Sequence, residues 1–322
     1  MSPRRSTGRK LLTALLPIVL VVVLAAVGAT VWLIYGATRP PARAYLITPE
    51  GFKQLSDRGL RATEESWPNR DGTQARGWLL RGAEGAPAVV LLHRYGADRS
   101  WLLNLGVKIN ESSNTTVLLP DLRGHGENPP VKTSSFGVLE ASDVLAALDY
   151  LRSLKTPQGR PLVSERLGLY GVEAGAYASL VAAAEGRAGV RALALDSVPD
   201  DPDEVLGSAV NARTGLDNAA LRALARLGAR LYFAGDYRNE PACNYAERLG
   251  DRRVLLLSGE DAGALRFSTE SLVRCFPNQQ NVEARTDLPL TGVTLASATP
   301  EQGEAYDRRV IEFFDRALGN GQ

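Results

Sequence analysis

The longest apolar run of the chain lies near its N-terminus. No residue from 11 to 37 is charged, whereas residues 1–10 contain four basic side chains. A bilayer core about 30 Å thick needs about 20 apolar residues in helical form, so this run is long enough to cross it. Trp32 and Tyr35 near its end suit the aromatic belt of a membrane interface. The pattern predicts a basic N-terminus over 1–10 and a transmembrane helix over 11–37.

A cleaved signal peptide is the alternative interpretation of this run. Signal peptides usually have an apolar core of about 7–15 residues, with a small-residue cleavage site close behind. The nearest A-x-A match after the run, at 42–44, lies well beyond its end. We therefore favour an uncleaved anchor, followed by a linker over 38–59 that starts at Pro40-Pro41. The excess of positive charge before the run predicts a cytoplasmic N-terminus and a body on the periplasmic or extracellular side.

Beyond residue 60, short apolar runs alternate with longer amphipathic stretches. Residues 74–80 alternate between apolar and polar, which predicts an early antiparallel strand. Continuous apolar runs bounded by turn residues predict strands that are covered on both faces, as in a parallel sheet. These runs are 88–92, 116–119, 167–170, 190–195 and 254–257.

Stretches with helical spacing separate these runs. Between residues 138 and 154 one helical stripe carries the apolar side chains Leu139, Val144, Leu145, Leu148 and Leu151. Further helices are predicted over 177–185, 216–227 and 302–317. Alternation of strands and helices predicts a doubly wound, mostly parallel α/β sheet. The domain would span 60–318, with a helical insertion over 200–248 that forms a cap.

Composition narrows the function classes. A net charge of +1 over 322 residues gives no basic field for nucleic acid, so we predict no nucleic-acid partner. Cys243 and Cys275 are too few for a disulfide framework or a metal site, although one bridge can form if the body is exported. The two histidines, His93 and His125, both follow apolar runs. We interpret them as turn residues with local hydrogen bonds.

Three short segments, each placed after a predicted strand, carry chemistry. They are 91–96 (LLHRYG), 119–126 (LPDLRGHG) and 171–175 (GVEAG). In this order they resemble three landmarks of the α/β-hydrolases: the turn that supplies part of the oxyanion hole, the D-x-R-G-H-G loop, and the nucleophile elbow. The resemblance covers roughly 60–318 and implies the α/β-hydrolase fold.

The catalytic residues that this resemblance implies are largely missing. Glu173 stands at the elbow position, where the family has its serine. The late histidine of the family falls in 281–297, which contains no histidine, and Val293 takes its place by position. Asp261 best matches the acid of the triad. Glu173, Asp261 and Val293 therefore mark a degenerate site.

The oxyanion hole is also altered. Arg94 follows His93 where the resemblance implies glycine, but backbone N–H donors from Arg94 or Tyr95 and from Ala174 remain as its equivalents. A Glu173 carboxylate at a helix N-terminus would be attracted to these donors and to the helix dipole. It would then fill the hole that a substrate oxyanion needs. Arg94, if it points inward, would pair with it.

Three functional hypotheses follow. The first is a membrane-anchored pseudohydrolase that serves as a binding or scaffolding module for an unidentified small molecule or protein. The second is a hydrolase of esters or related small substrates that uses Glu173 as nucleophile or general base, although a helix N-terminus lowers the pKa of a carboxyl group. The third places a site in the insertion, where the segment 200–204 carries four acids suited to a cation. Acids are common at solvated helix N-termini, so we predict no metal and no cofactor.

Overall fold

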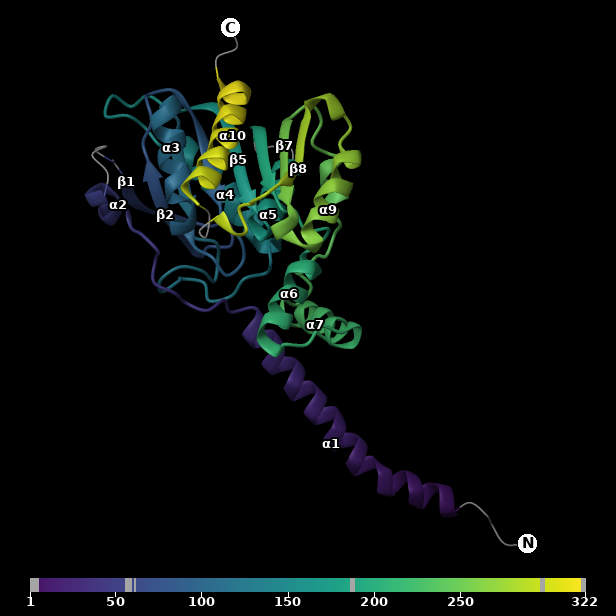
Figure 1. The fold of residues 1–322 in the computed structure, drawn as a ribbon. Coiled ribbons are helices and arrows are strands. Elements are labelled where there is room, and N and C mark those ends of the chain that lie inside the picture. The colour runs from purple at the N-terminus through teal and green to yellow at the C-terminus, as the bar shows by residue number, and fades with distance from the viewer. Residues whose placement is uncertain (1–5, 56–59, 61, 186–188, 296–298, 320–322) are drawn as a thin grey trace.

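The computed structural model describes residues 6–55, 60, 62–185, 189–295 and 299–319. Residues 4 and 5, two of the four basic positions before the apolar run, lie outside this range. An eight-stranded sheet forms the centre of the body in the order β1-β2-β4-β3-β5-β6-β7-β8 (Figure 1). The pairs β1–β2 and β2–β4 are antiparallel and all other pairs are parallel. The predicted doubly wound, mostly parallel α/β sheet is thus confirmed.

Six of the strands coincide with runs predicted from the sequence. The strands are β1 (Ala62–Pro68), β2 (Gln74–Leu80), β3 (Ala86–Leu92), β4 (Thr116–Pro120), β5 (Val163–Val172), β6 (Val190–Asp196), β7 (Arg253–Gly259) and β8 (Val282–Leu288). The two that the pattern did not predict, β1 and β8, form the sheet edges. Their sequences are polar and most of their residues are not fully buried, because an edge strand is only partly covered.

Helices cover both faces of the sheet. On one face α3 (Leu103–Ser113) and α10 (Pro300–Leu318) pack together. On the other face α4 (Val138–Ser153) packs beside α5 (Ala174–Ala184). On this second face α9 (Ala264–Leu272) covers β7 and β8. Within α4 the predicted stripe is buried except at Leu139, which is only partly covered. The two layers fill with separate apolar clusters, as a doubly wound sheet requires. The short 3-10 segments are η1 (Arg99–Leu102), η2 (Glu260–Ala262), η3 (Val273–Cys275) and η4 (Gln279–Asn281).

The N-terminal helix α1 (Ser6–Ala37) projects away from the body (Figure 1). Its segment Ala14–Ala37 has 24 residues and a mean hydropathy of 2.7, which is long and apolar enough to cross a membrane. Most of its large apolar side chains are exposed. Among the α1 side chains from residue 14 onward that the structure describes, the apolar ones buried against the body are Leu33, Ile34 and Ala37 near its end.

The segment after α1 runs back along the body. It contains a short helix, α2 (Pro49–Leu55), and residues 56–59 of the expected linker lie outside the described part of the chain. Tyr45 donates its hydroxyl to Asp121 Oδ2 at 2.6 Å, and the Leu46 N–H donates to Ser100 Oγ at 2.9 Å. These contacts fix the first part of the segment against the body.

The insertion folds as α6 (Pro202–Thr214), α7 (Ala219–Tyr232) and α8 (Ala242–Ala246). Helices α6 and α7 lie at the end of the body from which α1 departs, and both contact α1 (Figure 1). Apolar residues of α6 and α7 share a cluster with Ala174 at the start of α5, and α7 packs beside α1.

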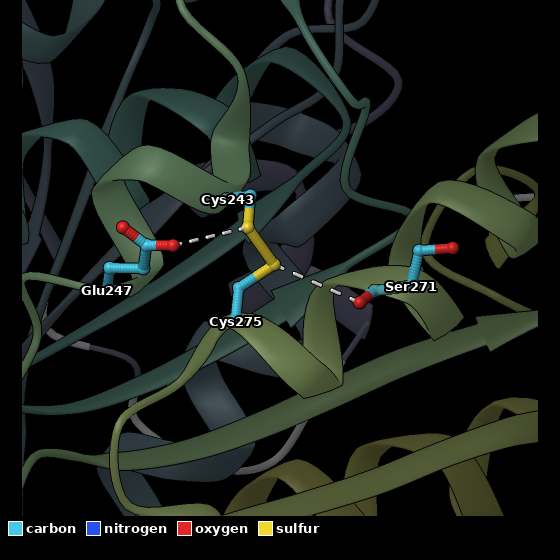
Figure 2. The surroundings of a disulfide bond; sticks show 4 residues. All are labelled: Cys243, Glu247, Ser271 and Cys275. Atoms are coloured by element: carbon cyan, nitrogen blue, oxygen red, sulfur yellow. Dashed lines mark hydrogen bonds between the residues drawn. A yellow bond between two sulfur atoms is a disulfide. The ribbon is translucent and has the colours of Figure 1, made fainter.

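A disulfide joins the end of the insertion to the layer that contains α9. Figure 2 shows Cys243 in α8 bonded to Cys275 in η3, with Cα atoms 5.2 Å apart. This separation lies within the usual range for a disulfide. The pairing that the sequence left open is therefore present. It closes a loop across 32 sequence positions.

Candidate functional site at the turn between β5 and α5

A one-residue turn connects the central strand β5 to α5. Glu173 is that residue, and its φ of 51° and ψ of −112° lie outside the regions that side chains usually adopt. The flanking glycines make the turn feasible, because a Cβ on Gly171 would collide with the Gly175 carbonyl. A Cβ on Gly175 would collide with the carbonyls of Leu92 and His93 at the end of β3. The strain is thus concentrated at Glu173 by close packing around it.

The Glu173 carboxylate is held by backbone donors. The Tyr95 N–H donates to Glu173 Oε2 at 2.9 Å. The Ala174 N–H and the positive charge of Arg94 also favour the ionised form. Even so, burial raises the pKa of Glu173 above its usual value. The residue as a whole keeps some exposure, but loss of water around the carboxyl group outweighs the helix N-terminus, so our expectation of a lowered pKa was wrong.

Arg94 does not form the ion pair that the sequence suggested. Its Nη1 donates to the Tyr95 carbonyl at 3.0 Å, and its guanidinium lies 4.9 Å from the centroid of the Trp101 ring. Within the part of the chain that the structure describes, no Arg94–Glu173 bridge is present. The carbonyl and the aromatic ring hold the guanidinium to one side, and its charge reaches Glu173 only through space.

Both histidines are structural residues of the neighbouring turns. The Leu122 N–H donates to His93 Nε2 at 3.0 Å, and the Gly96 N–H donates to His125 Nε2 at 2.9 Å. Each Nε2 must therefore accept, so each Nδ1 carries the proton and donates to a nearby backbone carbonyl. Burial lowers the pKa of His93 well below its usual range and that of His125 to about 4. Neutral, locally bonded rings confirm the structural interpretation.

Asp261 has hydroxyl partners in place of a histidine. Its Oδ2 accepts from the Thr291 N–H at 3.0 Å and from the Thr291 hydroxyl at 2.9 Å. The Thr294 hydroxyl donates to the same oxygen. Asp261 thereby fastens the segment 291–294, in which Val293 is partly buried against the α10 side of the sheet. Residues 296–297 of the predicted late loop lie outside the described residues.

A second buried carboxylate, which the sequence analysis missed, lies directly behind the turn. Asp196 ends β6, and its carbonyl accepts the Glu173 N–H at 2.9 Å. Its carboxylate accepts from the Gly292 N–H at 2.6 Å, from the Ser197 hydroxyl at 2.7 Å and from the Tyr306 hydroxyl. Burial raises its pKa to about 6. An aspartate that ends an otherwise apolar strand was the sequence signal for this network, which ties the turn to the late segment and to α10.

The end of α1 contacts Tyr95 and shares an apolar cluster with the start of α5. Leu33, Ile34 and Ala37 share one apolar cluster with Ala174, the first residue of α5, and with Phe136. The Tyr95 hydroxyl donates to the Ala37 carbonyl at 2.5 Å. Tyr95 thus contacts the Glu173 carboxylate with its backbone and the end of α1 with its side chain.

The acids that open the insertion are used within the protein. Asp201 accepts the Asp203 N–H at 2.8 Å as the N-cap of α6. Asp203 accepts from Tyr237 and pairs with Arg226 at 2.6 Å. Across the described ranges, no group of three or more His, Cys, Asp and Glu side chains is placed to hold a metal ion.

Solved structures resemble this architecture over nearly their whole length. An esterase from Pyrococcus furiosus superimposes with a TM-score of 0.62 at 19% identity, covering 88% of this chain and 98% of the esterase. The chain has the α/β-hydrolase fold. An α/β-hydrolase from Penicillium sp. gives a TM-score of 0.59 at 17% identity (81% and 100% covered), and a dienelactone hydrolase from Anabaena variabilis gives 0.55 at 17% identity (80% and 99% covered). No protein-family model matches the sequence, and no curated protein sequence is significantly similar to it.

The α/β-hydrolase fold gives the described turn a clear counterpart. In this fold the nucleophile lies on a sharp strand-to-helix turn, and the oxyanion hole uses the N–H of the next residue together with one from the loop after an earlier strand. Here that geometry presents Glu173, with the Ala174 and Tyr95 N–H groups beside it. At identities below 20% the likeness extends to the fold, and the chemistry has to be argued from these residues.

Proposed function

We propose that this chain is a membrane-anchored pseudohydrolase, which serves as a binding or scaffolding module and lacks ordinary serine-hydrolase activity. One observation carries the proposal: the Glu173 carboxylate accepts the Tyr95 N–H and lies beside the Ala174 N–H, the two donors that an α/β-hydrolase reserves for the substrate oxyanion. A carboxylate already bound there competes with any oxyanion for the same N–H groups.

The groups around the turn support this proposal. Asp261, the counterpart of the triad acid, is occupied by Thr291 and Thr294, and Val293 supplies no proton acceptor. The end of α1 and the helices α6 and α7 contribute to the apolar cluster that includes Ala174. A substrate would have to displace internal contacts on both sides of Glu173.

The anchored topology is part of the same proposal. Residues 1–10 would lie in the cytoplasm, 11–37 would span the membrane, 38–59 would connect, and the domain 60–318 with its insertion 200–248 would lie on the periplasmic or extracellular side. The Cys243–Cys275 disulfide supports this side, because disulfides persist in oxidising compartments.

A second candidate is a hydrolase that uses the Glu173 carboxylate itself. The raised pKa of Glu173 favours it, since a general base works best when its pKa approaches the working pH. Esterases among the structural neighbours make an ester a reasonable substrate class. The hydrogen bond from Tyr95 opposes it, because it stabilises the carboxylate and reduces its nucleophilicity.

Labelling separates the two candidates. We expect no fluorophosphonate label on the wild-type chain and some label on the double variant Glu173→Ser, Val293→His, because the turn would regain a nucleophile and a base. Label on the wild type that survives in Glu173→Gln would reveal a different active site. Incubation with ester substrates in H₂¹⁸O tests the carboxylate nucleophile: an increase of about 2 Da in the peptide that contains Glu173 would overturn the pseudohydrolase proposal.

A further inference from the structure

Helix α7 has three different sides. Ala225, Gly228 and Ala229 are buried, and Gly228 lies against Ile34 and Thr30 of α1. A second side carries Leu227 and Leu231, which are one helical turn apart and 56% and 73% exposed. Such exposure of consecutive leucines at i and i+4 is not needed for packing within the body. It marks a surface that contacts something apolar.

The polar side of α7 fixes how the helix is rotated. Arg226 pairs with Asp203 at 2.6 Å, Arg222 pairs with Asp217 at 3.5 Å, and Arg230 donates to Asn239 at 2.8 Å. These partners belong to the insertion itself. The small residues of α7 face α1, and its arginines face the rest of the insertion. The side that carries Leu227 and Leu231 therefore faces away from the protein.

The contact with α1 sets the level of α7 along the apolar helix. Gly228 touches Thr30 and Ile34, and these residues bracket Trp32. Trp32 and Tyr35 are the exposed aromatic residues near the end of the apolar run, and such residues settle at the level of the lipid headgroups. At 1.5 Å rise per residue, α7 crosses α1 within about one helical turn of that level.

Two arginines lie against the rings of Trp32 and Tyr35. The guanidinium of Arg213, at the end of α6, lies 4.7 Å from the centroid of the Trp32 ring, and that of Arg39 lies 3.6 Å from the Tyr35 ring. Aromatic rings stacked with guanidinium groups combine an apolar body with a cation that suits lipid phosphates. If α1 spans a bilayer, Leu227 and Leu231 on the helix that crosses it beside Trp32 come to the boundary between headgroups and acyl chains.

We propose that α7 is an interfacial membrane helix, whose Leu227 and Leu231 side is immersed in the leaflet on the body side of the bilayer that α1 spans. This inference rests on the anchoring role proposed for α1. The helix would lie in the membrane surface in the manner of amphipathic anchors and would hold the body at a fixed height and rotation above the lipid.

Site-directed spin labelling of the full chain in vesicles of phosphatidylcholine and phosphatidylglycerol tests this arrangement. The native cysteines are joined to each other, so Leu227→Cys and Leu231→Cys each add one free thiol for a nitroxide. Arg222→Cys, on the polar side of the same helix, is the matched control. Collision with oxygen, which concentrates in lipid, is compared with collision with a water-soluble nickel chelate.

We expect the labels at 227 and 231 to collide mainly with oxygen and the label at 222 to collide mainly with nickel. Equal nickel access at all three positions would overturn the interfacial helix. Protection from both reagents with dipolar broadening at 231 would also overturn it, because a second copy of the chain would then cover the leucines. Carbonate extraction distinguishes the two proposals: release of the chain from vesicles contradicts the anchor, whereas retention with nickel access at 231 contradicts only the position of α7.

Discussion

The turn at Glu173 and the outer side of α7 are opposites. At the turn, the carboxylates of Glu173, Asp196 and Asp261 all accept hydrogen bonds from the chain itself. On α7, large apolar side chains face outward, as Leu231 shows most clearly. The position that holds the nucleophile in α/β-hydrolases carries internal hydrogen bonds here, whereas the exposed leucines of α7 lie on a helix that packs beside the apolar helix α1. The polar groups of the turn thus have internal partners, whereas the apolar side of α7 is left exposed.

The largest effect is expected from filling the turn. In Gly175→Val the new side chain would meet the carbonyls of Leu92 and His93, which are backbone atoms that cannot rotate aside. We expect a loss of about 4 kcal/mol or more in the free energy of unfolding, or failure to fold. Ala223→Val, at an exposed position on α7, is the control and should change it by less than about 1 kcal/mol. Urea unfolding in detergent micelles measures both, and similar losses would show that the turn is not tightly packed.

The disulfide between the insertion and the α9 layer should contribute nearly as much. Replacing Cys243 and Cys275 by serine reopens a loop across 32 positions. Loop entropy predicts a loss of about 3.7 kcal/mol. The melting temperature of the double variant should equal that of the reduced wild type. A wild-type chain whose melting temperature does not change on reduction would contradict this contribution.

A pH dependence is expected from the turn beside Tyr95. His125 is neutral when folded, with a pKa of about 4 against 6.5 when exposed, so the unfolded chain binds its proton first as the pH falls. The stability that neutral His125 provides is complete above pH 6.5 and is lost as the pH falls towards 4. Between pH 6.5 and 5 this loss amounts to about 2 kcal/mol.

The variant His125→Gln isolates this effect from the buried carboxylates, because it changes only the imidazole. It should be less stable than wild type at pH 7, and the gap should narrow by about 2 kcal/mol at pH 5. Chemical unfolding at the two pH values measures the gap. A gap that stays constant would show that His125 does not titrate on unfolding.

The smallest effect is expected on the outer side of α7. Leu227→Ala with Leu231→Ala removes apolar atoms that the body does not bury. In micelles the free energy of unfolding should change by less than about 1 kcal/mol. A large loss in this measurement would mean that these leucines pack within the protein and do not face lipid.

The sequence predicted the central features of the fold and fewer of those at the site. Strands covered on both faces, such as β3 and β7, could be predicted because their sequences are continuous apolar runs. The edge strands β1 and β8 could not, since an edge strand keeps polar residues. Glu173 and Val293 could be recognised as differing from the serine and the late histidine that the resemblance to α/β-hydrolases implies, because the segment 171–175 matches the nucleophile elbow of that family. Contacts between residues far apart in the sequence could not be predicted. No short sequence pattern indicated that Asp196 would accept a hydrogen bond from Tyr306, or that burial would outweigh the helix dipole in setting the pKa of Glu173.

The decisive test of the pseudohydrolase proposal compares the purified full chain with Glu173→Gln in the hydrolysis of p-nitrophenyl acetate and butyrate. Glutamine keeps the size of the side chain and removes its charge, so it abolishes any role of the carboxylate as nucleophile or base. We expect no turnover by the wild type above that of the variant. Wild-type turnover that disappears in Glu173→Gln would contradict the proposal and identify the turn as a working active site.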